Sequence, residues 1–159
     1  MSNDEKPEKQ EKLIADNRKA AFEYHILDTW EAGIVLQGTE VKSIREGGIS
    51  LRESFCKVMG GEIFLWNAHI APYSHRGSAD HEPTRTRKLL LKRQEINKLI
   101  GKTVEKGLTL VPLRMYFKKG RIKLAVALAR GKNVRDKRET VKRREADRET
   151  RAAVKSRIR

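Results

Sequence analysis

The chain has 159 residues and a formal net charge of +15 at pH 7. This length suits one domain with attached tails, and this charge indicates a polyanionic partner, either nucleic acid or an anionic membrane surface. The sequence contains neither the roughly 20 consecutive apolar residues that a membrane-spanning helix needs nor a signal-peptide-like start, so we expect a cytosolic protein.

The N-terminal part of the chain changes from polar to strand-like. Residues 1–16 are charged and offer little to bury, so we expect them to be disordered. Residues 21–36 are rich in aromatic and β-branched side chains and predict a long strand, in which Gly33 indicates a bulge or a bend. The stretch 17–24 fits either a strand or a loop.

A change of period predicts a short helix within residues 38–48. Val41 and Ile44 are three positions apart, Thr39 fits the N-cap, and Gly47 fits the C-terminal stop. The segment therefore reads as a helix between strands.

Two hairpins follow from glycine-containing turns. Strand-like runs flank Gly60-Gly61, and a second pair of runs flanks Lys119-Gly120. Pro112 places its strand at an edge or a bulge, because proline cannot donate to the sheet. The single cysteine, Cys56, excludes an internal disulfide and lies in a strand-like run, which predicts a buried thiol.

The remaining segments connect these hairpins. Residues 71–87 contain two prolines, a glycine and two of the four histidines without periodicity, which predicts a long functional loop. Residues 87–91, RKLLL, fit a strand or a helix equally well. Residues 92–107 carry apolar side chains at helical spacing, and Gly101 predicts a split into two short helices.

The sum of these elements predicts a mainly β fold. We expect a small closed antiparallel barrel of about six strands, OB-like, with about three short α-helices and a disordered basic C-terminal tail. Closing the barrel removes the exposed sheet edges. The expected domains are a disordered segment at 1–16, the OB-like barrel at 17–130 and the basic tail at 131–159.

Enzyme signatures are absent from the sequence. It has no Walker loop, no GxGxxG, no GxSxG and no HExxH, and its four histidines and one cysteine show no zinc spacing. The Asp80-His81-Glu82 run reads as a solvated loop. We therefore expect a protein that is no enzyme and has no cofactor or metal. The alternative is a nuclease that works through His69, His75 or His81.

Basic clusters are the stronger functional signal. They are Asn17-Arg18-Lys19, then Arg85, Arg87 and Lys88 in TRTRK, then Lys118, Lys119 and Arg121 in the last hairpin. Barrels of this size bind RNA with basic residues and exposed aromatic rings, and Trp30, Trp66 and Tyr116 are candidate stacking residues. A general RNA chaperone is a second alternative. The presence of both TRTRK and the GKNVRDKR run argues against it, because a generic basic barrel does not need both motifs.

The chain resembles the SmpB family, the SsrA-binding proteins of bacterial trans-translation. The resemblance covers about residues 17–138 and is carried by NRKAAFEY, EAGIVLQGTEVKSIREG, ESF, WNAHIAPY, PTRTRKLLL, EINKLIGK, LTLVPLRMYFKKGRIKLAVALARGK and DKR, in this order. It implies an oligonucleotide-binding-type barrel that binds the tRNA-like domain of tmRNA. It further implies delivery of tmRNA, as a monomeric partner and with elongation factor Tu and GTP, to stalled ribosomes for tagging of the incomplete protein.

The resemblance also implies site residues. It places Asn17, Arg18 and Lys19, together with Glu31 and the helix carrying Glu40, Lys42 and Arg45, on the tmRNA-binding face, and TRTRK adds Arg85, Arg87 and Lys88. Acids on such a face can accept hydrogen bonds from base amino groups or 2′-hydroxyls, or orient neighbouring arginines. For Val41, Ile44 and residues 89–91 we expect core packing.

The tail combines high charge with helix-supporting spacing. From Gly131 onward it carries 12 Lys or Arg against five Asp or Glu, a net charge of +7. Oppositely charged pairs such as Glu139 and Arg143 are four apart, but each adds only about 0.2–0.5 kcal/mol, and an isolated helix of this length is marginal. The tail is therefore predicted to become helical only against rRNA.

The resemblance gives the tail its task. It implies that the tail occupies the empty mRNA channel of the stalled ribosome, downstream of the decoding site. The ribosome-binding residues implied are Gly131, Lys132, Arg135, Asp136, Lys137 and Arg138. The family pattern has a second lysine where this chain has Asn133, and an aromatic residue or histidine where it has Arg135, whose guanidinium can still stack on a base or pair with phosphate.

Overall fold

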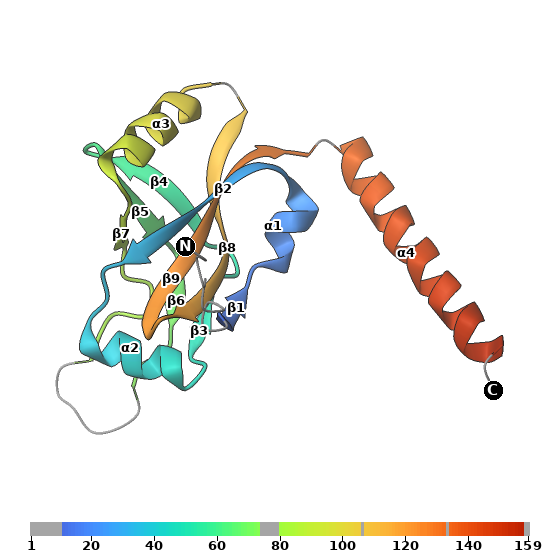
Figure 1. The fold of residues 1–159 in the computed structure, drawn as a ribbon, viewed down its shortest axis with the longest axis horizontal. Helices are drawn as coiled ribbons and strands as arrows, with labels where there is room; N and C mark the ends of the chain where they lie inside the picture. The colour runs from blue at the N-terminus through green and yellow to red at the C-terminus, as the bar shows by residue number, and fades with distance from the viewer. Residues whose placement is uncertain (1–10, 74–79, 106, 133, 158–159) are drawn as a thin grey trace, which may run out of the picture.

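The computed structural model describes residues 11–73, 80–105, 107–132 and 134–157 (Figure 1). In chain order the elements of these residues are β1 (Lys12–Asp16), α1 (Arg18–Glu23), β2 (Tyr24–Ile34), α2 (Gly38–Arg45), β3 (Ile49–Ser50), β4 (Phe55–Met59), β5 (Glu62–Trp66), β6 (His69–Ile70), β7 (Arg87–Leu90), α3 (Arg93–Thr103), β8 (Leu108–Lys118), β9 (Arg121–Gly131) and α4 (Val134–Arg157).

Six antiparallel strands close into a ring. The sheet order is β1-β8-β4-β5-β7-β2-β9, and β8 also pairs with β9, so the strands from β8 round to β9 form a closed circuit. The long strand β8 serves two neighbours: Leu110 pairs with Cys56 of β4, whereas residues 114–117 pair with β1. The prediction of a mainly β, OB-like fold with about six strands is confirmed.

Both predicted hairpins are present, and their turns explain why. Gly60 and Gly61 have φ of +57° and +77°, and Lys119 and Gly120 have φ of +51° and +74°. Two successive residues with positive φ make a turn whose twist matches that of the flanking strands. Cys56, next to the first turn, is 5% exposed, so the prediction of a buried thiol is confirmed, and burial raises the pKa of that thiol.

The irregularities of the strands were only partly predicted. The bulge expected near Pro112 is confirmed, because the β8–β9 register shifts between Pro112 and Arg114. Of the bulge or bend expected at Gly33, the bulge is wrong, because the β2–β9 register shifts between Ile26 and Asp28 and not at Gly33. Gly33 meets a different demand: a Cβ placed there would come within 3.2 Å of the Leu90 Cβ, so the close approach of β7 favours glycine.

Three helical predictions require correction. The helix α2 begins at Gly38 after an N-cap at Gln37 rather than at Thr39, because the Glu40 carboxylate reaches back to accept a hydrogen bond from the Gln37 backbone N–H at 2.8 Å. The helix α3 runs through Gly101 without a split. The helix α1 occupies residues 18–23, within a stretch predicted to be strand or loop.

The N-terminal segment is also more ordered than predicted. We expected residues 1–16 to be disordered, but Lys12–Asp16 form β1, which pairs antiparallel with β8. Its half-buried Ile14 and Ala15 pack against the core. A long-range pairing partner therefore supplies the order that the local composition does not predict. Residues 1–10 lie outside the described residues.

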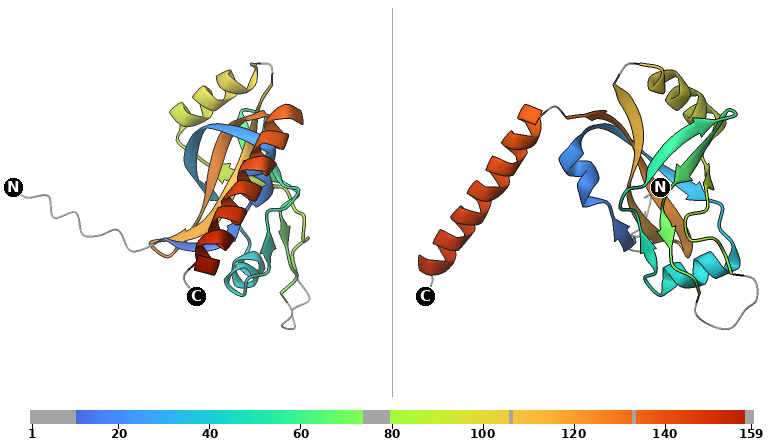
Figure 2. Two further views of the ribbon diagram at one scale, coloured as in Figure 1. Left: turned by 90° about the vertical axis from the view of Figure 1, so that its right-hand side faces the viewer. Right: turned by 180° about the vertical axis from the view of Figure 1, so that it is seen from behind.

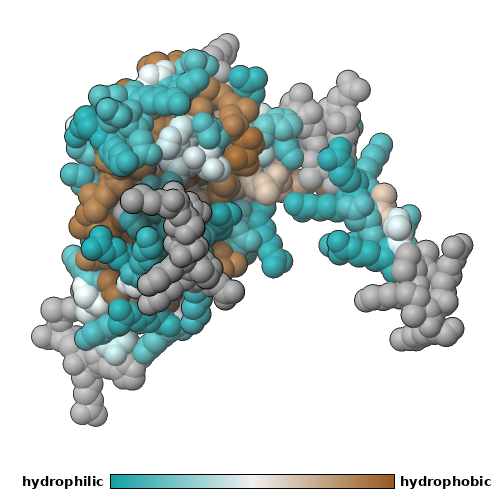
Figure 3. Space-filling model, viewed as in Figure 1, coloured by the Kyte–Doolittle hydropathy of each residue, from teal (hydrophilic) through white to brown (hydrophobic). Residues whose placement is uncertain are grey.

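The basic tail forms a separate element. Residues 134–157 are a single helix, α4, which leaves the end of β9 and projects from the ring (Figures 1 and 2). The tail that the sequence predicts to be disordered is thus a continuous helix in the structure, which agrees with its i,i+4 charge spacing. That the helix forms only on the ribosome stays a prediction. The view in Figure 3 shows α4 as mostly hydrophilic, with the apolar surface on the ring.

The core fills the ring. Its fully buried members include Ile44 of α2, Leu99 of α3, and Leu65, Leu89 and Leu124 of the strands. The helices α2 and α3 each bury one apolar face on this core, as their 3–4 residue spacing predicts. The outward faces of the strands are therefore left to carry function.

Candidate nucleic-acid interface

A shallow groove lies where β2, β7 and β9 meet. We call it the β2–β9 groove; it is lined by Gly33, Ile34, Leu36, Val41, Leu90, Gly120, Arg121, Ile122 and Lys123. Its apolar floor includes Leu90, which is 51% exposed, and its rim is basic. An apolar floor beside cations suits a partner that presents flat bases and phosphates together.

Glu31 lies next to the groove and holds two side chains in place. Its Oε2 accepts a hydrogen bond from the Tyr116 hydroxyl at 2.6 Å and another from Lys118 Nζ at 3.2 Å. The bond from Tyr116, followed by the bond and charge of Lys118 and the charge of Lys123, lowers the pKa of Glu31. The carboxylate is therefore ionised at neutral pH and orients the cations around it.

Lys123 belongs to this face although the sequence analysis did not select it. It pairs with Gly33 in β2 and with Tyr116 in β8, which places it diagonally across from Glu31. The signal was available in the alternation of β9, because Arg121 and Lys123 are two residues apart. Lys119, which was selected, is exposed in the adjacent turn.

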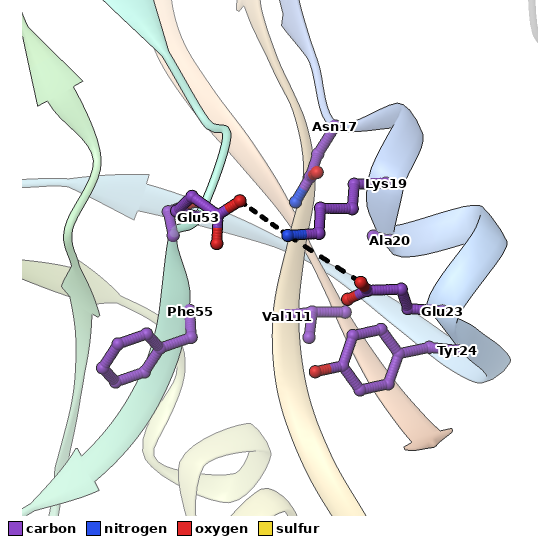
Figure 4. Close-up of a pocket in the computed structure, with 9 residues that line it drawn as sticks. Asn17, Lys19, Ala20, Glu23, Tyr24, Glu53, Phe55 and Val111 are labelled. Carbon is purple, nitrogen blue, oxygen red and sulfur yellow. Dashed lines mark hydrogen bonds and ion pairs between the residues drawn. The ribbon is translucent and has the colours of Figure 1, made fainter. Parts of the chain in front are cut away.

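A second pocket lies beneath α1 (Figure 4). Asn17 is anchored there, because its Nδ2 donates to the Pro112 carbonyl at 2.8 Å and its backbone N–H donates to the Leu113 carbonyl at 2.8 Å. Lys19 lies between two acids, 2.6 Å from Glu53 and 3.8 Å from Glu23. The hydrogen bond to Glu53 raises the pKa of Lys19.

The pocket places the first basic cluster near one edge of the ring. Tyr24, Phe55 and Val111 line the same pocket, so polar and aromatic groups meet there. Arg18 is exposed beside it. Asn17, Arg18 and Lys19 are thus brought together, but apart from Glu31.

The TRTRK cluster divides between the interior and the surface. Arg87 and Glu40 have no exposed side-chain area and form an ion pair through Arg87 Nε and Glu40 Oε2. Arg87 also donates to the carbonyls of Ala68 at 2.8 Å and Pro83 at 3.1 Å. A side chain without exposed area offers nothing to RNA, so we leave Glu40 and Arg87 out of the direct interface.

Arg85 links this buried pair to the surface. Its Nη2 donates to Glu40 Oε1 at 2.5 Å and to the Val35 carbonyl at 3.2 Å, while 29% of its side chain stays exposed. Burial alone would raise the pKa of Glu40, but hydrogen bonds from Arg85, the Gln37 backbone and Arg87 outweigh it and hold that pKa below its usual value. Glu40 therefore fixes the position of Arg85.

The other selected cations are at the surface. Lys42 and Arg45 are exposed on α2, and Lys42 Nζ lies 5.4 Å from the centre of the Tyr73 ring. Lys88 is 44% exposed and 4.0 Å from Glu62. These three residues remain available to an RNA backbone.

The three histidines of the nuclease alternative differ in their surroundings. His81 is buried, with Nδ1 2.9 Å from Thr39 Oγ1 and Nε2 2.9 Å from the Ile70 carbonyl, so both ring nitrogens are engaged in holding α2 against β6. His69 is exposed in β6, and His75 lies outside the described residues. Among the residues that the structure describes, no three His, Cys, Asp or Glu side chains gather as a metal site would need.

The root of the tail is tied to α1. The backbone N–H of Lys132 donates to the Glu23 carbonyl at 2.8 Å, and its Nζ donates to the Ala21 carbonyl at 3.3 Å. Gly131, which ends β9, and Arg138 of α4 are exposed; the side chains of Arg135, Asp136 and Lys137 lie outside the described residues, as does Asn133. Farther along α4, the Arg144 guanidinium lies 5.7 Å from the centre of the Phe22 ring.

The candidate aromatic residues occupy three environments. Tyr116 is 4% exposed and Trp30 packs against the core, so neither presents a free ring face. Trp66 points outward from β5 and stacks on Phe55.

No helix in the described part of the chain has the length and apolar character needed to cross a membrane.

Comparison with known proteins identifies what the chain is similar to. A model of the family described as "SmpB protein" matches residues 14–156. An SsrA-binding protein of Trichodesmium erythraeum is 56% identical over 146 residues, covering 91% of this chain and 94% of the relative. One of Geobacillus sp. strain WCH70 is 56% identical over 151 residues, covering 95% and 97%.

A solved structure agrees with these relatives. It is described as "tmRNA-SmpB: a journey to the center of the bacterial ribosome" and is 48% identical to this chain. It superposes with a TM-score of 0.63, covering 79% of this chain and 92% of its own.

Proposed function

Because the chain belongs to the SmpB protein family, we propose that it binds tmRNA, the SsrA RNA, and delivers it to stalled ribosomes for trans-translation. The incomplete protein is then tagged for degradation and the ribosome is rescued. Relatives that match nearly the whole chain at more than half identity carry the name SsrA-binding protein, and a structural neighbour contains tmRNA and SmpB.

The observation that carries the proposed tmRNA face is the Glu31 cluster beside the β2–β9 groove. Glu31 fixes Lys118 by a direct hydrogen bond and draws Lys123 toward the same place by charge. Cations held in advance lose less side-chain entropy when they meet phosphate. The exposed Leu90 offers an apolar contact to a base next to them.

Other surface residues extend this face. The direct contacts that we propose are made by Asn17, Arg18, Lys19, Glu31, Lys42, Arg45, Arg85, Lys88, Lys118, Lys119 and Lys123. Glu40 and Arg87 support them from below, since the buried carboxylate orients Arg85 and the buried guanidinium holds the loop carbonyls. The ring as a whole thus binds the tRNA-like domain.

The tail has a separate role in the proposal. The described side chains of α4 are exposed, so the helix has no apolar face to bury on the ring. A cationic helix of this kind gains stability when phosphates neutralise its lysines and arginines. We place it in the mRNA channel of the stalled ribosome, where Gly131, Lys132, Arg135, Asp136, Lys137 and Arg138 form its root and first turns.

The remaining partners follow from the same role. The chain acts as a monomer in the cytoplasm, and elongation factor Tu with GTP reaches it through the aminoacylated tmRNA. It performs no chemistry: His81, the buried member of the proposed nuclease set, has both ring nitrogens engaged in the fold. Incubation of the purified protein with RNA and a divalent metal tests the nuclease alternative by the appearance of cleavage products.

RNA capture in cells tests the proposal as a whole. The full-length protein is cross-linked to its RNA in living bacteria and purified, and the RNA that is purified with it is sequenced. We expect the share of tmRNA in the captured RNA to be much larger than its share of total RNA. A mixture that mirrors total RNA would instead support a general RNA chaperone.

Replacement of Glu31 gives a prediction in which the direction of the change in tmRNA affinity separates an orienting role from a purely electrostatic one. Replacing it with alanine frees Lys118 and Tyr116 from their shared acceptor, and a hydrogen bond to a charged group contributes about 1.5–3 kcal/mol. We expect Glu31→Ala to weaken tmRNA binding about tenfold or more, and Glu31→Gln, which keeps an acceptor, to weaken it less. Titration of labelled tmRNA measures both variants.

A purely electrostatic role gives the opposite result. Removing an anion beside RNA would then tighten binding in both variants. Thermal unfolding of each variant serves as the control for loss of fold.

A further inference from the structure

One outward face of the ring carries aromatic rings between lysines. It meets the tmRNA face proposed above at Lys88 and Leu90, and at Phe55, which lines the pocket beneath α1. In β4 the outward residues are Phe55, Lys57 and Met59; in β5 they are Glu62, Phe64 and Trp66; in β7 they are Lys88 and Leu90. The intervening Cys56, Ile63, Leu65 and Leu89 are buried in the core. We call the outward set of Phe55, Lys57, Phe64, Trp66 and Lys88 the β4–β5 platform.

Strand register fixes the arrangement of the platform. Phe55 lies directly opposite Trp66, and Phe64 lies between Lys57 on one side and Lys88 on the other. Directly opposed residues have Cβ atoms about 4.5–5.5 Å apart, and rows two residues apart along a strand are separated by about 6.7 Å. A row of two rings therefore runs beside a row in which one ring is flanked by two cations.

The rings of the first row are parallel and offset. The ring centres of Phe55 and Trp66 are 6.2 Å apart with an interplanar angle of 5°. Phe55 stays 38% exposed, and neither Trp66 nor Phe64 is among the side chains packed on the core. Phe64 and Trp66 are half-buried, so together with the exposed Phe55 they keep part of their ring surface open to a partner.

Charge selects the chemistry of that partner. Glu62 is an acid on this face, but Arg93 lies 2.7 Å from it and Lys88 lies 4.0 Å from it, and Lys57 is exposed. The face therefore keeps an excess of positive charge around its rings. Flat aromatic rings next to lysines match unpaired bases joined by phosphates.

We propose that the β4–β5 platform binds an unpaired segment of RNA, with bases stacked on Trp66 and Phe64 and phosphates paired with Lys57 and Lys88. The platform adjoins the β2–β9 groove through β7, because Leu90 lines the groove and lies two residues from Lys88 on the same face. The inference goes beyond the tmRNA face and does not require that the RNA be tmRNA.

Fluorescence of Trp66 tests this proposal directly. The chain has two tryptophans, so Trp30→Phe leaves Trp66 as the sole reporter in the full-length protein. Titration with a short oligo-uridine is expected to quench Trp66 saturably, whereas a blunt RNA duplex of the same length is expected to leave it nearly unchanged. A saturable response that is equal for duplex and single strand, or absent for both, overturns the proposal.

Variants separate stacking from charge. Base stacking contributes about 1–3 kcal/mol per base, so Phe64→Leu, which keeps an apolar side chain without a ring, is expected to weaken oligo-uridine binding about tenfold. Replacing both Lys57 and Lys88 with alanine is expected to make the slope of log affinity against log salt shallower by about 1.4, at about 0.7 per lost contact. Lys98→Ala on α3 removes one exposed lysine outside the platform and should change neither quantity.

Two further outcomes are diagnostic. If Trp66 fluorescence changes with protein concentration in the absence of RNA, a second copy of this chain occupies the platform and the proposal fails. The variant Lys123→Ala is expected to leave oligo-uridine quenching intact. Loss of tmRNA binding by this variant without loss of quenching supports two separate surfaces, whereas unchanged tmRNA binding counts against the proposed tmRNA face alone.

Discussion

Truncation of the chain after Asn133 is expected to abolish tagging of stalled proteins and to leave tmRNA binding nearly unchanged. The buried core extends from Ala20 to Ala129, and the side chains of α4 that the structure describes are exposed, so the ring keeps its fold without the tail. Retaining Lys132 preserves its backbone bond to Glu23. The tail carries about half of the net charge, which the ribosome proposal assigns to rRNA.

Peptidyl transfer to alanyl-tmRNA measures this effect. The reaction is run on ribosomes that carry either truncated or long mRNAs. A matched pair of point variants isolates helicity: Ala146→Pro, within α4, costs about 3 kcal/mol in a helix interior, whereas Ala146→Ser leaves the helix possible. Transfer at the normal rate by the truncated chain would show that the tail is dispensable.

Loss of Glu40 is expected to destabilise the ring by about 3–5 kcal/mol, because Glu40→Ala leaves the fully buried Arg87 without its partner. The change also removes the acceptor for the Gln37 backbone N–H that starts α2. Domains of this size are stable by only about 5–15 kcal/mol, so a large share of the population would unfold under mild stress.

Urea unfolding with a surface control measures this loss. Glu62→Ala breaks the exposed ion pair with Arg93 and should hardly move the unfolding midpoint. The pKa of Glu40 is lower when folded, so its contribution is present above the unfolded pKa and is lost as pH falls through the folded pKa. Equal midpoints for the Glu40→Ala and Glu62→Ala variants would disprove the structural role of the buried pair.

Local signals predicted the parts of the fold that depend on neighbours in sequence. Gly60-Gly61 and Lys119-Gly120 gave both hairpins, since positive φ at two successive residues is a property of the turn itself. Pro112 gave the bulge in β8 because it lacks an N–H. Closure of the ring followed from the need to pair every strand edge.

Elements that depend on distant partners escaped prediction. The strand β1 looks disordered by composition and gains its order from β8, about 100 residues away. The helix α1 lies in a stretch whose aromatic residues favour a strand, and its single fully buried residue is Ala20. In both places tertiary pairing decides between local alternatives that the sequence leaves nearly equal.

The candidate site shows the same division. The alternation of β7 buries Leu89 and with it Arg87, so an arginine that reads as a surface cation lies inside the ring. Its pairing with Glu40, 47 residues earlier, and its hydrogen bonds to the carbonyls of Ala68 and Pro83 make that burial possible. Lys123 was missed for the converse reason: its spacing from Arg121 is visible in the sequence, but its function depends on β2, which places Glu31 diagonally across from it.

Competition binding at physiological salt tests most directly whether this chain recognises tmRNA. Labelled tmRNA is bound to the full-length protein and challenged with unlabelled tmRNA or with an RNA duplex of similar length. We predict that unlabelled tmRNA displaces the label whereas the duplex does so only at a large excess, and that Lys123→Ala narrows this difference. If the duplex displaces labelled tmRNA as well as tmRNA itself does, the chain binds RNA by charge alone and the proposed function is wrong.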